Sequence, residues 1–189
     1  KKARGYNSCL EMSLDGNNIP TSVFFNLINA VDENLEPLHK WTKIRKRILG
    51  VDTLYPWDQY VPLVTEYNKQ YSYDEARKMV IEALQPMGES YLNDFKKGIE
   101  PGSGWIDAFE TEGKGTGAYQ WGTYTSHPFI LLNHAGTLED VFTIAHEMGH
   151  AMHSHLSNTS QPRTKAQYSI FVAEVASTLN EGLLLEYLL

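Results

Sequence analysis

The five residues from His146 to His150 read His-Glu-Met-Gly-His, a spacing that suits metal-assisted hydrolysis. On an α-helix, side chains four positions apart share one face, about 5–6 Å apart, so both histidines could bind a single ion. Glu147 is offset by about 100° around the helix and still lies close enough to act as a general base on water. The same short pattern can arise by chance on a solvated helix without metal. Its interpretation therefore depends on a helix and on a third ligand.

The residues around this motif predict a helix over about 138–156. Thr137 and Asp140 have the spacing of an N-cap residue and a carboxylate that returns the hydrogen bond. A polar loop is expected after the helix, from Ser157 to Pro162. Apolar residues recur at spacings of three and four, as a buried helix face requires: Val141, Ile144, Ala145, Met148 and Met152.

His153 is a poor third ligand, although it shares a helix face with His146 and His150. It is seven residues beyond His146, about 10 Å along one rigid axis, whereas zinc–nitrogen bonds are only about 2 Å long. The metzincin pattern also fails, because it places glycine where this chain has His153 and histidine where it has Leu156. We therefore interpret His153 as a residue of the helix face or rim.

Glu174 is the remaining candidate, in a second predicted helix that runs from about residue 166 to the end of the chain. Its neighbours are mostly apolar, so burial of its carboxylate would be costly unless it were paired or bound to metal. A His-His-Glu set with an open fourth position is typical of catalytic zinc. An ordinary salt-bridged surface carboxylate stays open as the alternative. Three polar residues on the same side could orient the ligands: Ser177, Thr178 and Glu181.

The whole chain predicts a mainly α fold with a small β-sheet, an α+β arrangement without repeats. Residues 1–98 predict helices, 99–136 a glycine-rich loop with short strands, and 137–189 the two helices that carry the metal ligands. Two strands are predicted, Tyr119–Thr125 and Phe129–Leu132. The other predicted helices open at Pro20, run between Pro37 and Gly50, extend from the capping pair Ser72 and Glu75 to about Leu84, and span Glu89 to Lys97.

The glycine-rich segment from Gly113 to Gly117 lacks the spacing of a phosphate-binding loop, and no strand-to-helix turn follows it. We interpret it as a turn or a substrate-covering loop, because glycines let a peptide backbone approach closely. An edge strand beside it could pair with an extended substrate.

Composition excludes several classes of partner. The net charge of −7 over 189 residues argues against nucleic acid or an anionic membrane. The single Cys9 cannot form an intramolecular disulfide and fits a reducing compartment, so we expect a cytoplasmic location. We expect neither a membrane span nor a signal peptide, since no apolar run approaches about 18 residues. The sequence gives no indication of oligomeric state.

Two segments together, His146–Ser154 and Phe171–Thr178, resemble the oligoendopeptidase F branch of the thimet oligopeptidase family of zinc metallopeptidases. The resemblance extends upstream over most of the chain, to five further segments: Asn17–Pro20, Tyr60–Leu63, Trp105–Asp107, Gly113–Tyr119 and His127–Asn133.

The resemblance implies a zincin-like catalytic core of a larger helical peptidase, with residues 1–189 forming part of one catalytic domain. It implies one zinc ion per chain on His146, His150 and Glu174, with Glu147 as the base. The implied activity is zinc-dependent endopeptidase cleavage of internal amide bonds in short oligopeptides, inside a deep channel that excludes folded proteins. Family members are longer, so we expect a fragment truncated at both ends. It would lack the family's downstream His and Tyr segment, and the fragment alone would be nearly inactive, since one lost oxyanion donor costs about 10²–10³ in rate.

Two alternative functions stay open. The first is another zinc peptidase class, either a carboxypeptidase or a thermolysin-like enzyme. The thermolysin type usually has an aspartate soon after its glutamate ligand, and no aspartate follows Glu174. The second is a catalytically incomplete zinc-binding fragment.

Overall fold

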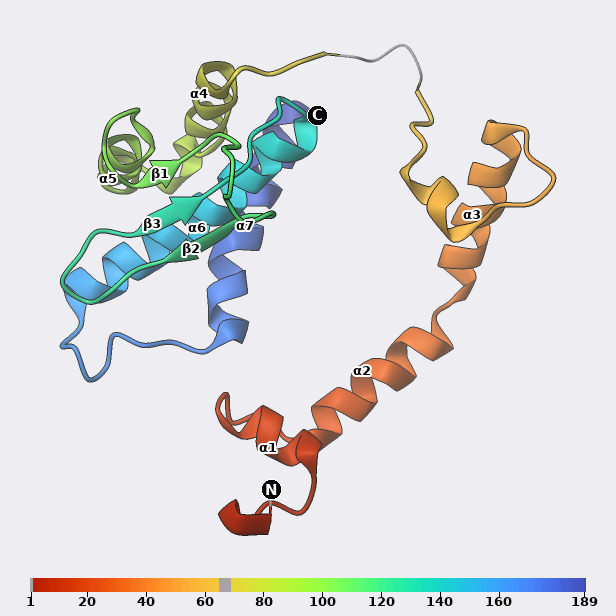
Figure 1. Cartoon of the computed structure of the whole chain (residues 1–189), viewed down its shortest axis with the longest axis horizontal. Helices are drawn as coiled ribbons and strands as arrows, with labels where there is room; N and C mark the ends of the chain where they lie inside the picture. The colour runs from red at the N-terminus through yellow and green to blue at the C-terminus, as the bar shows by residue number, and fades with distance from the viewer. Residues whose placement is uncertain (1, 65–68) are drawn as a thin grey trace. The chain divides into compact units, whose positions relative to one another are not determined.

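The computed structural model describes residues 2–64 and 69–189, which divide into two compact units, Lys1–Asn68 and Lys69–Leu189. Helices predominate in both units, and the described strands form a single small sheet in the second unit (Figure 1). The predicted mainly α fold with a small sheet is thereby confirmed. No helix of the described residues combines the length and apolar character that a bilayer crossing requires.

The first unit is a series of short helices. After a 3₁₀ turn at Lys2–Arg4 come α1 (Cys9–Asp15), α2 (Thr21–Glu33), α3 (Glu36–Leu49) and a second 3₁₀ turn, η2 (Pro56–Tyr60). Gly50 ends α3 in the left-handed conformation, with φ of 66°, which glycine adopts without a Cβ penalty. The helices expected after Pro20 and between Pro37 and Gly50 are confirmed.

Arg45 on α3 is buried, although its sequence neighbours Lys46 and Arg47 are exposed. Its side chain is 7% exposed, and its guanidinium donates to the backbone carbonyls of Asp58, Gln59 and Val61. Several carbonyls of the η2 turn thus converge on one planar donor, as the fork of an arginine allows. Burial of this charge depends on a loop that folds back over α3, which helix periodicity does not predict.

The second unit contains the apolar core. Its helices are α4 (Tyr73–Ala83), α5 (Glu89–Ile99), α6 (Leu138–Ser160) and α7 (Ile170–Leu188), with a 3₁₀ turn, η3 (Gln85–Met87), between α4 and α5. The predicted capping box of α4 is present, because Ser72 Oγ accepts from the Glu75 amide and Glu75 Oε2 accepts from the Ser72 amide. Side chains from α4, α5 and α6 meet in this core with almost no exposure: Val80, Phe95, Ile144 and Met148.

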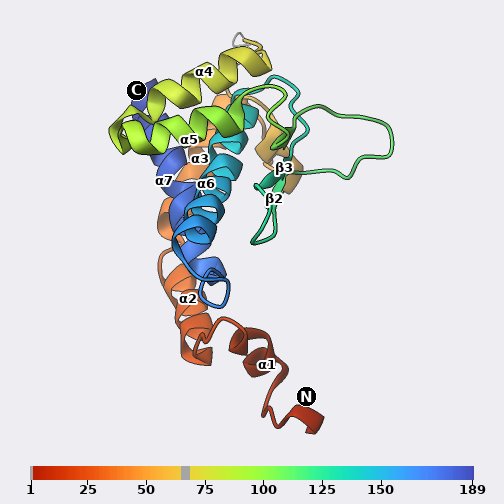
Figure 2. The same ribbon diagram turned by 90° about the vertical axis from the view of Figure 1, so that its left-hand side faces the viewer.

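The sheet has the strand order β1-β3-β2, with β1 (Ile106–Asp107) parallel and β2 (Tyr119–Trp121) antiparallel to β3 (Phe129–Leu131). The predicted strands at 119 and 129 are confirmed but are shorter than expected. β1 is not predicted from the sequence, because two residues are too few to show an alternating pattern. β2 and β3 pack along α6, and α7 lies side by side with α6 (Figures 1 and 2).

The two long helices differ from their predicted bounds. α6 begins as expected, since Thr137 Oγ1 accepts from the Asp140 amide and Asp140 Oδ2 accepts from the Thr137 amide. It continues to Ser160, because Ser157 Oγ donates to the Ala166 carbonyl and Thr159 Oγ1 donates to the His155 carbonyl. These polar side chains bond to nearby carbonyls and do not break the helix. α7 begins at Ile170, four residues later than the predicted position 166.

Gly149 lies where the backbones of α6 and α7 approach each other closely. A Cβ atom at this position would lie 2.7 Å from the Ala176 carbonyl oxygen and 2.8 Å from Ser177 Cα. Both atoms belong to backbone, so no rotamer change could relieve the contact. The glycine inside the His-Glu-Met-Gly-His motif therefore lets the two helix backbones approach directly.

We expect Gly149→Ala to destabilise the protein and to weaken zinc binding. Overpacking of a tight contact costs about 1–3 kcal/mol, and the better helix propensity of alanine, worth about 1 kcal/mol, offsets only part of it. Denaturant unfolding and zinc titration of the full-length protein measure both effects. Gly182→Ala is the control on α7, because a Cβ there meets no atom within 4 Å. Equal stability and zinc affinity in the two variants would contradict the proposed close contact.

Candidate metal centre

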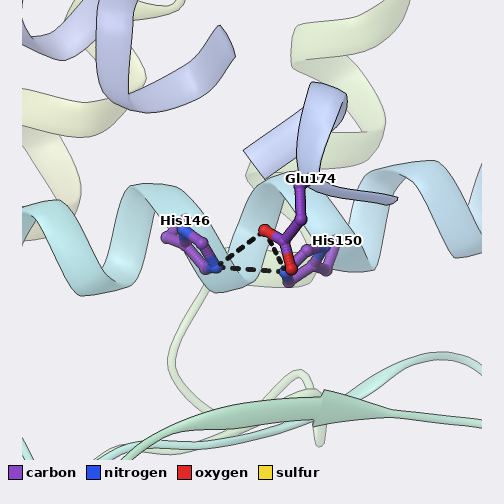
Figure 3. Close-up of side chains that lie close together, drawn as sticks. All are labelled: His146, His150 and Glu174. Atoms are coloured by element: carbon purple, nitrogen blue, oxygen red, sulfur yellow. Dashed lines mark hydrogen bonds and ion pairs between the residues drawn. The ribbon is translucent and has the colours of Figure 1, made fainter. Parts of the chain in front are cut away.

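His146, His150 and Glu174 converge on one point between α6 and α7 (Figure 3). His146 Nε2 lies 3.1 Å from His150 Nε2. Glu174 Oε2 lies 3.6 Å from His146 Nε2 and 3.7 Å from His150 Nε2. The three side chains predicted as ligands from the sequence are thus brought together by the fold.

These separations fit a tetrahedral metal ion. Ligand atoms about 2.0–2.1 Å from a tetrahedral centre lie roughly 3.3–3.4 Å from one another. The three observed distances lie within a few tenths of an ångström of that value. Two imidazole nitrogens and one carboxylate oxygen are also the donor set that catalytic zinc sites use. The residues present therefore fit a zinc ion.

α7 supplies hydrogen-bond partners to both histidines as well as the carboxylate. Glu181 Oε1 lies 2.5 Å from His146 Nδ1, and the His150 ring hydrogen-bonds to the backbone of Ala173. Bonds of this kind fix the orientation of a ligating imidazole and leave its other nitrogen facing the metal. Glu181 is predicted as such a partner from its position in the sequence, whereas the Ala173 backbone is not, because a backbone group carries no side-chain signal.

Ser177 and Thr178 differ in their contact with the Glu174 carboxylate. Ser177 Oγ donates to Glu174 Oε2 at 2.8 Å, so it contacts the carboxylate directly. The Thr178 hydroxyl instead donates to the backbone carbonyl of Glu174 at 2.6 Å. Ser177 thus bonds to the predicted ligand atom, whereas the Thr178 hydroxyl bonds within its own helix and has no described bond to the carboxylate.

Burial shifts the pKa of two groups at the centre. Burial, together with the nearby His146, lowers the pKa of His150 and favours the neutral form that a metal ligand needs. Burial raises the pKa of the Glu147 carboxyl, which is 7% exposed. Within the described chain, Glu147 Oε2 is buried without a hydrogen-bond partner. Burial of this oxygen without a donor disfavours the charged carboxylate, in agreement with the raised pKa.

The surroundings of Glu174 differ from those assumed in the sequence analysis. Its side chain is 45% exposed, and its neighbours Phe171 and Val175 are 72% and 60% exposed. Among the apolar residues at positions 171–173, 175 and 176, Ala173 is the one that is buried. An apolar environment therefore does not explain the carboxylate, and the explanation is its approach to the two histidines.

The other histidines of α6 lie outside the centre, as predicted. The His153 ring stacks on Tyr168 with centroids 3.8 Å apart. His155 Nε2 lies 3.8 Å from an Asp94 carboxylate oxygen, and its ring lies beside Trp105. Both are held by neighbours other than the ligand set.

The glycine-rich loop is tied to the rest of the second unit. Asn133 Nδ2 donates to the carbonyls of Gly115 and Gly117, at 3.0 and 2.8 Å. Lys114 Nζ donates to the Phe109 carbonyl at 2.6 Å and lies 3.1 Å from the Asp107 carboxylate. The role of the loop as a substrate cover stays a prediction.

Comparison with known proteins decides the family. The profile of Peptidase family M3 matches residues 2–189. The chain belongs to this family. The resemblance to oligoendopeptidase F seen in the sequence is thereby confirmed.

Several members of the family are similar over the whole chain. The oligopeptidase PepF of Bacillus subtilis is 40% identical over all of this chain and 28% of its own length, and an oligoendopeptidase F homolog of Borreliella burgdorferi is 39% identical over all of this chain and 32% of its own length. The chain thus spans about a third or less of these relatives.

Solved structures give the same result for the fold. A Chlamydophila abortus crystal structure, 45% identical, matches 99% of this chain and 31% of its own with a TM-score of 0.77. The oligoendopeptidase-F of Enterococcus faecium, 32% identical, matches 99% of this chain and 25% of its own with a TM-score of 0.57.

We expect Glu181→Gln to weaken zinc binding of the full-length protein about 10–100-fold, the usual effect of removing a partner of a metal-binding histidine. The amide can still hydrogen-bond to His146 Nδ1, but it lacks the charge that makes the imidazole a stronger donor. Glu186→Gln, an exposed substitution on the same helix, is the control. Competition with a zinc chelator measures the affinities. Unchanged affinity in Glu181→Gln would show that this carboxylate does not support the ligand.

Proposed function

We propose that this chain is part of the catalytic core of a zinc-dependent endopeptidase that hydrolyses internal amide bonds of short oligopeptides. The observation that carries the proposal is the meeting of His146 Nε2, His150 Nε2 and Glu174 Oε2 beside the buried carboxylate of Glu147. Membership of Peptidase family M3 supports it. The names of the relatives, oligopeptidase and oligoendopeptidase, support the choice of short peptides as substrates.

In the proposed mechanism each residue has one role. His146, His150 and Glu174 would hold one zinc ion per chain, oriented by Glu181, the Ala173 backbone and Ser177. When bound, zinc acts as a Lewis acid on the scissile carbonyl and makes a water molecule more acidic. Glu147 takes the proton of the attacking water and then passes it to the leaving nitrogen.

We place both units in one catalytic domain of a larger peptidase in the cytoplasm, with peptides as partners and neither nucleic acid nor membrane. The net charge of −7 supports the exclusion of polyanionic partners.

The test uses the full-length protein and a set of peptides blocked at both ends, graded in length, together with a stably folded protein. We expect internal cleavage of the short peptides, loss of activity with a metal chelator, and recovery when zinc is added. Cleavage that requires a free carboxyl terminus would favour a carboxypeptidase. Zinc binding without turnover of any peptide would contradict the proposed activity.

A further inference from the structure

A pocket of about 450 Å³ opens directly beside the metal centre, at His150 and Ala173. It continues along α6 to Ser154 and Asn158, and its opposite wall is formed by β2 and the turn that follows it. Pockets of this size are in the range that binds small ligands and side chains. Because His150 forms one end of the pocket, a peptide bond at the metal centre would place a neighbouring side chain inside it.

The chemistry of the lining favours an uncharged occupant. Among the described residues that line the pocket there is no Asp, Glu, Lys or Arg. A charged side chain would lose its hydration there without gaining an opposite charge, which is costly. Aromatic and apolar surface is contributed by Trp121, Tyr124, Pro128, Tyr168 and Ile170.

The far walls of the pocket are fixed by hydrogen bonds. Ser154 Oγ lies 2.5 Å from the Tyr168 hydroxyl and donates to Gln120 Oε1 at 3.2 Å. The Tyr168 ring also stacks on His153. Tyr124 donates its hydroxyl to the Gln161 carbonyl at 2.9 Å, which ties the turn after β2 to the end of α6. A wall held in this way is organised before a ligand arrives, which lowers the entropic cost of binding.

A second pocket indicates on which side of the metal centre each half of the substrate lies. It measures about 330 Å³ and lies at the other end of the ligand pair, lined by Glu147 together with His146 and Glu181. In the proposed mechanism Glu147 delivers a proton to the leaving nitrogen, so the leaving half of the peptide must lie toward Glu147. The acyl half, which supplies the scissile carbonyl, then extends toward His150 and the first pocket.

We propose that the pocket between β2, Ser154 and Tyr168 binds an uncharged, preferably aromatic or large apolar, side chain on the acyl side of the scissile bond. The aromatic and apolar side chains of the lining, Tyr168 among them, determine this specificity, on a wall that Gln120 and Ser154 hold in place. This inference rests on the proposed peptidase function and adds to it the side-chain class and the side of the cleavage site.

The test introduces a single negative charge into the pocket of the full-length protein. Gln120→Glu keeps the shape of the side chain and the oxygen that accepts from Ser154. Two series of blocked peptides are compared. One series has Phe, Leu, Lys or Glu on the acyl side of the scissile bond, and the other has the same four residues on the leaving side. The wild-type protein is expected to prefer Phe and Leu over both charged residues at least tenfold in kcat/KM on the acyl side.

In Gln120→Glu, kcat/KM for the peptide with acyl-side Lys, relative to that with acyl-side Phe, is expected to rise at least tenfold. The order of kcat/KM values in the leaving-side series should stay the same. A gain for one substrate cannot result from misfolding. Gln85→Glu, an exposed change outside the pocket, should leave both series unaltered. Tyr168→Ala should lower kcat/KM for acyl-side Phe at least tenfold with zinc content unchanged.

The outcomes separate the two proposals. If the wild-type protein hydrolyses none of the peptides, the proposed function itself fails. If peptides are cleaved but Gln120→Glu changes the leaving-side preference, or neither preference, the function stands and the assignment of this pocket is overturned.

Discussion

Glu147→Gln is expected to leave one zinc ion bound per chain and to lower kcat of the full-length peptidase by about 10²–10⁴-fold, the usual contribution of a general base. The amide has the same shape as the carboxylate but cannot take a proton from water. The hydrogen bonds described for His146, His150 and Glu174 do not include the Glu147 carboxylate, so the substitution removes none of them. Metal binding and chemistry should therefore separate in this variant.

Zinc analysis and peptide kinetics on the same preparation measure the two effects. Glu186→Gln, exposed on α7, is the matched control and should retain full activity. Activity at the wild-type level in Glu147→Gln would rule out this residue as the base. Loss of zinc together with activity would instead show that the carboxylate supports the metal.

His146→Ala is expected to have the second large effect, on metal binding itself. Removal of an outer partner of a ligand costs about 10–100-fold in metal affinity, and loss of a direct ligand should exceed that range. The change also leaves the Glu181 carboxylate without the imidazole that now lies 2.5 Å away. Both zinc content and peptidase activity should fall.

The stabilisation that zinc gives to the folded protein provides an independent measurement. A ligand present at 100 times its dissociation constant stabilises by about 2.7 kcal/mol, so zinc should raise the Tm of the wild-type protein. His146→Ala should lose this rise, and His39→Ala, exposed on α3, should keep it. A zinc-dependent rise of wild-type size in His146→Ala would contradict its assignment as a ligand.

The candidate zinc ligands on α6 could be predicted from local sequence. The spacing of His146 and His150 depends only on helix geometry, and the Thr137–Asp140 cap that starts the helix is equally local. The two strands at 119 and 129 and the capped start of α4 were also predicted, because each depends on short-range patterns.

The position of Glu174 was harder to derive, for a physical reason. The apolar residues of α7 lie on several of its own faces, and Phe171, Val172 and Val175 are exposed in this chain. Periodicity therefore cannot indicate which face of α7 meets α6. Elimination of His153 left Glu174 as the candidate ligand and the resemblance to a family supported it, while the fold brings it within 3.7 Å of both histidines.

By itself the sequence determined the imidazoles of His146 and His150, the carboxylate of Glu147 and the helix that carries all three, because these follow from the geometry of one helix. Only the tertiary structure decided how α7 completes the centre. Gly149 lets the backbones touch, and Glu181 and the Ala173 backbone fix the imidazole rings. Contacts between helices distant in sequence depend on packing of the whole core, and no local pattern encodes them.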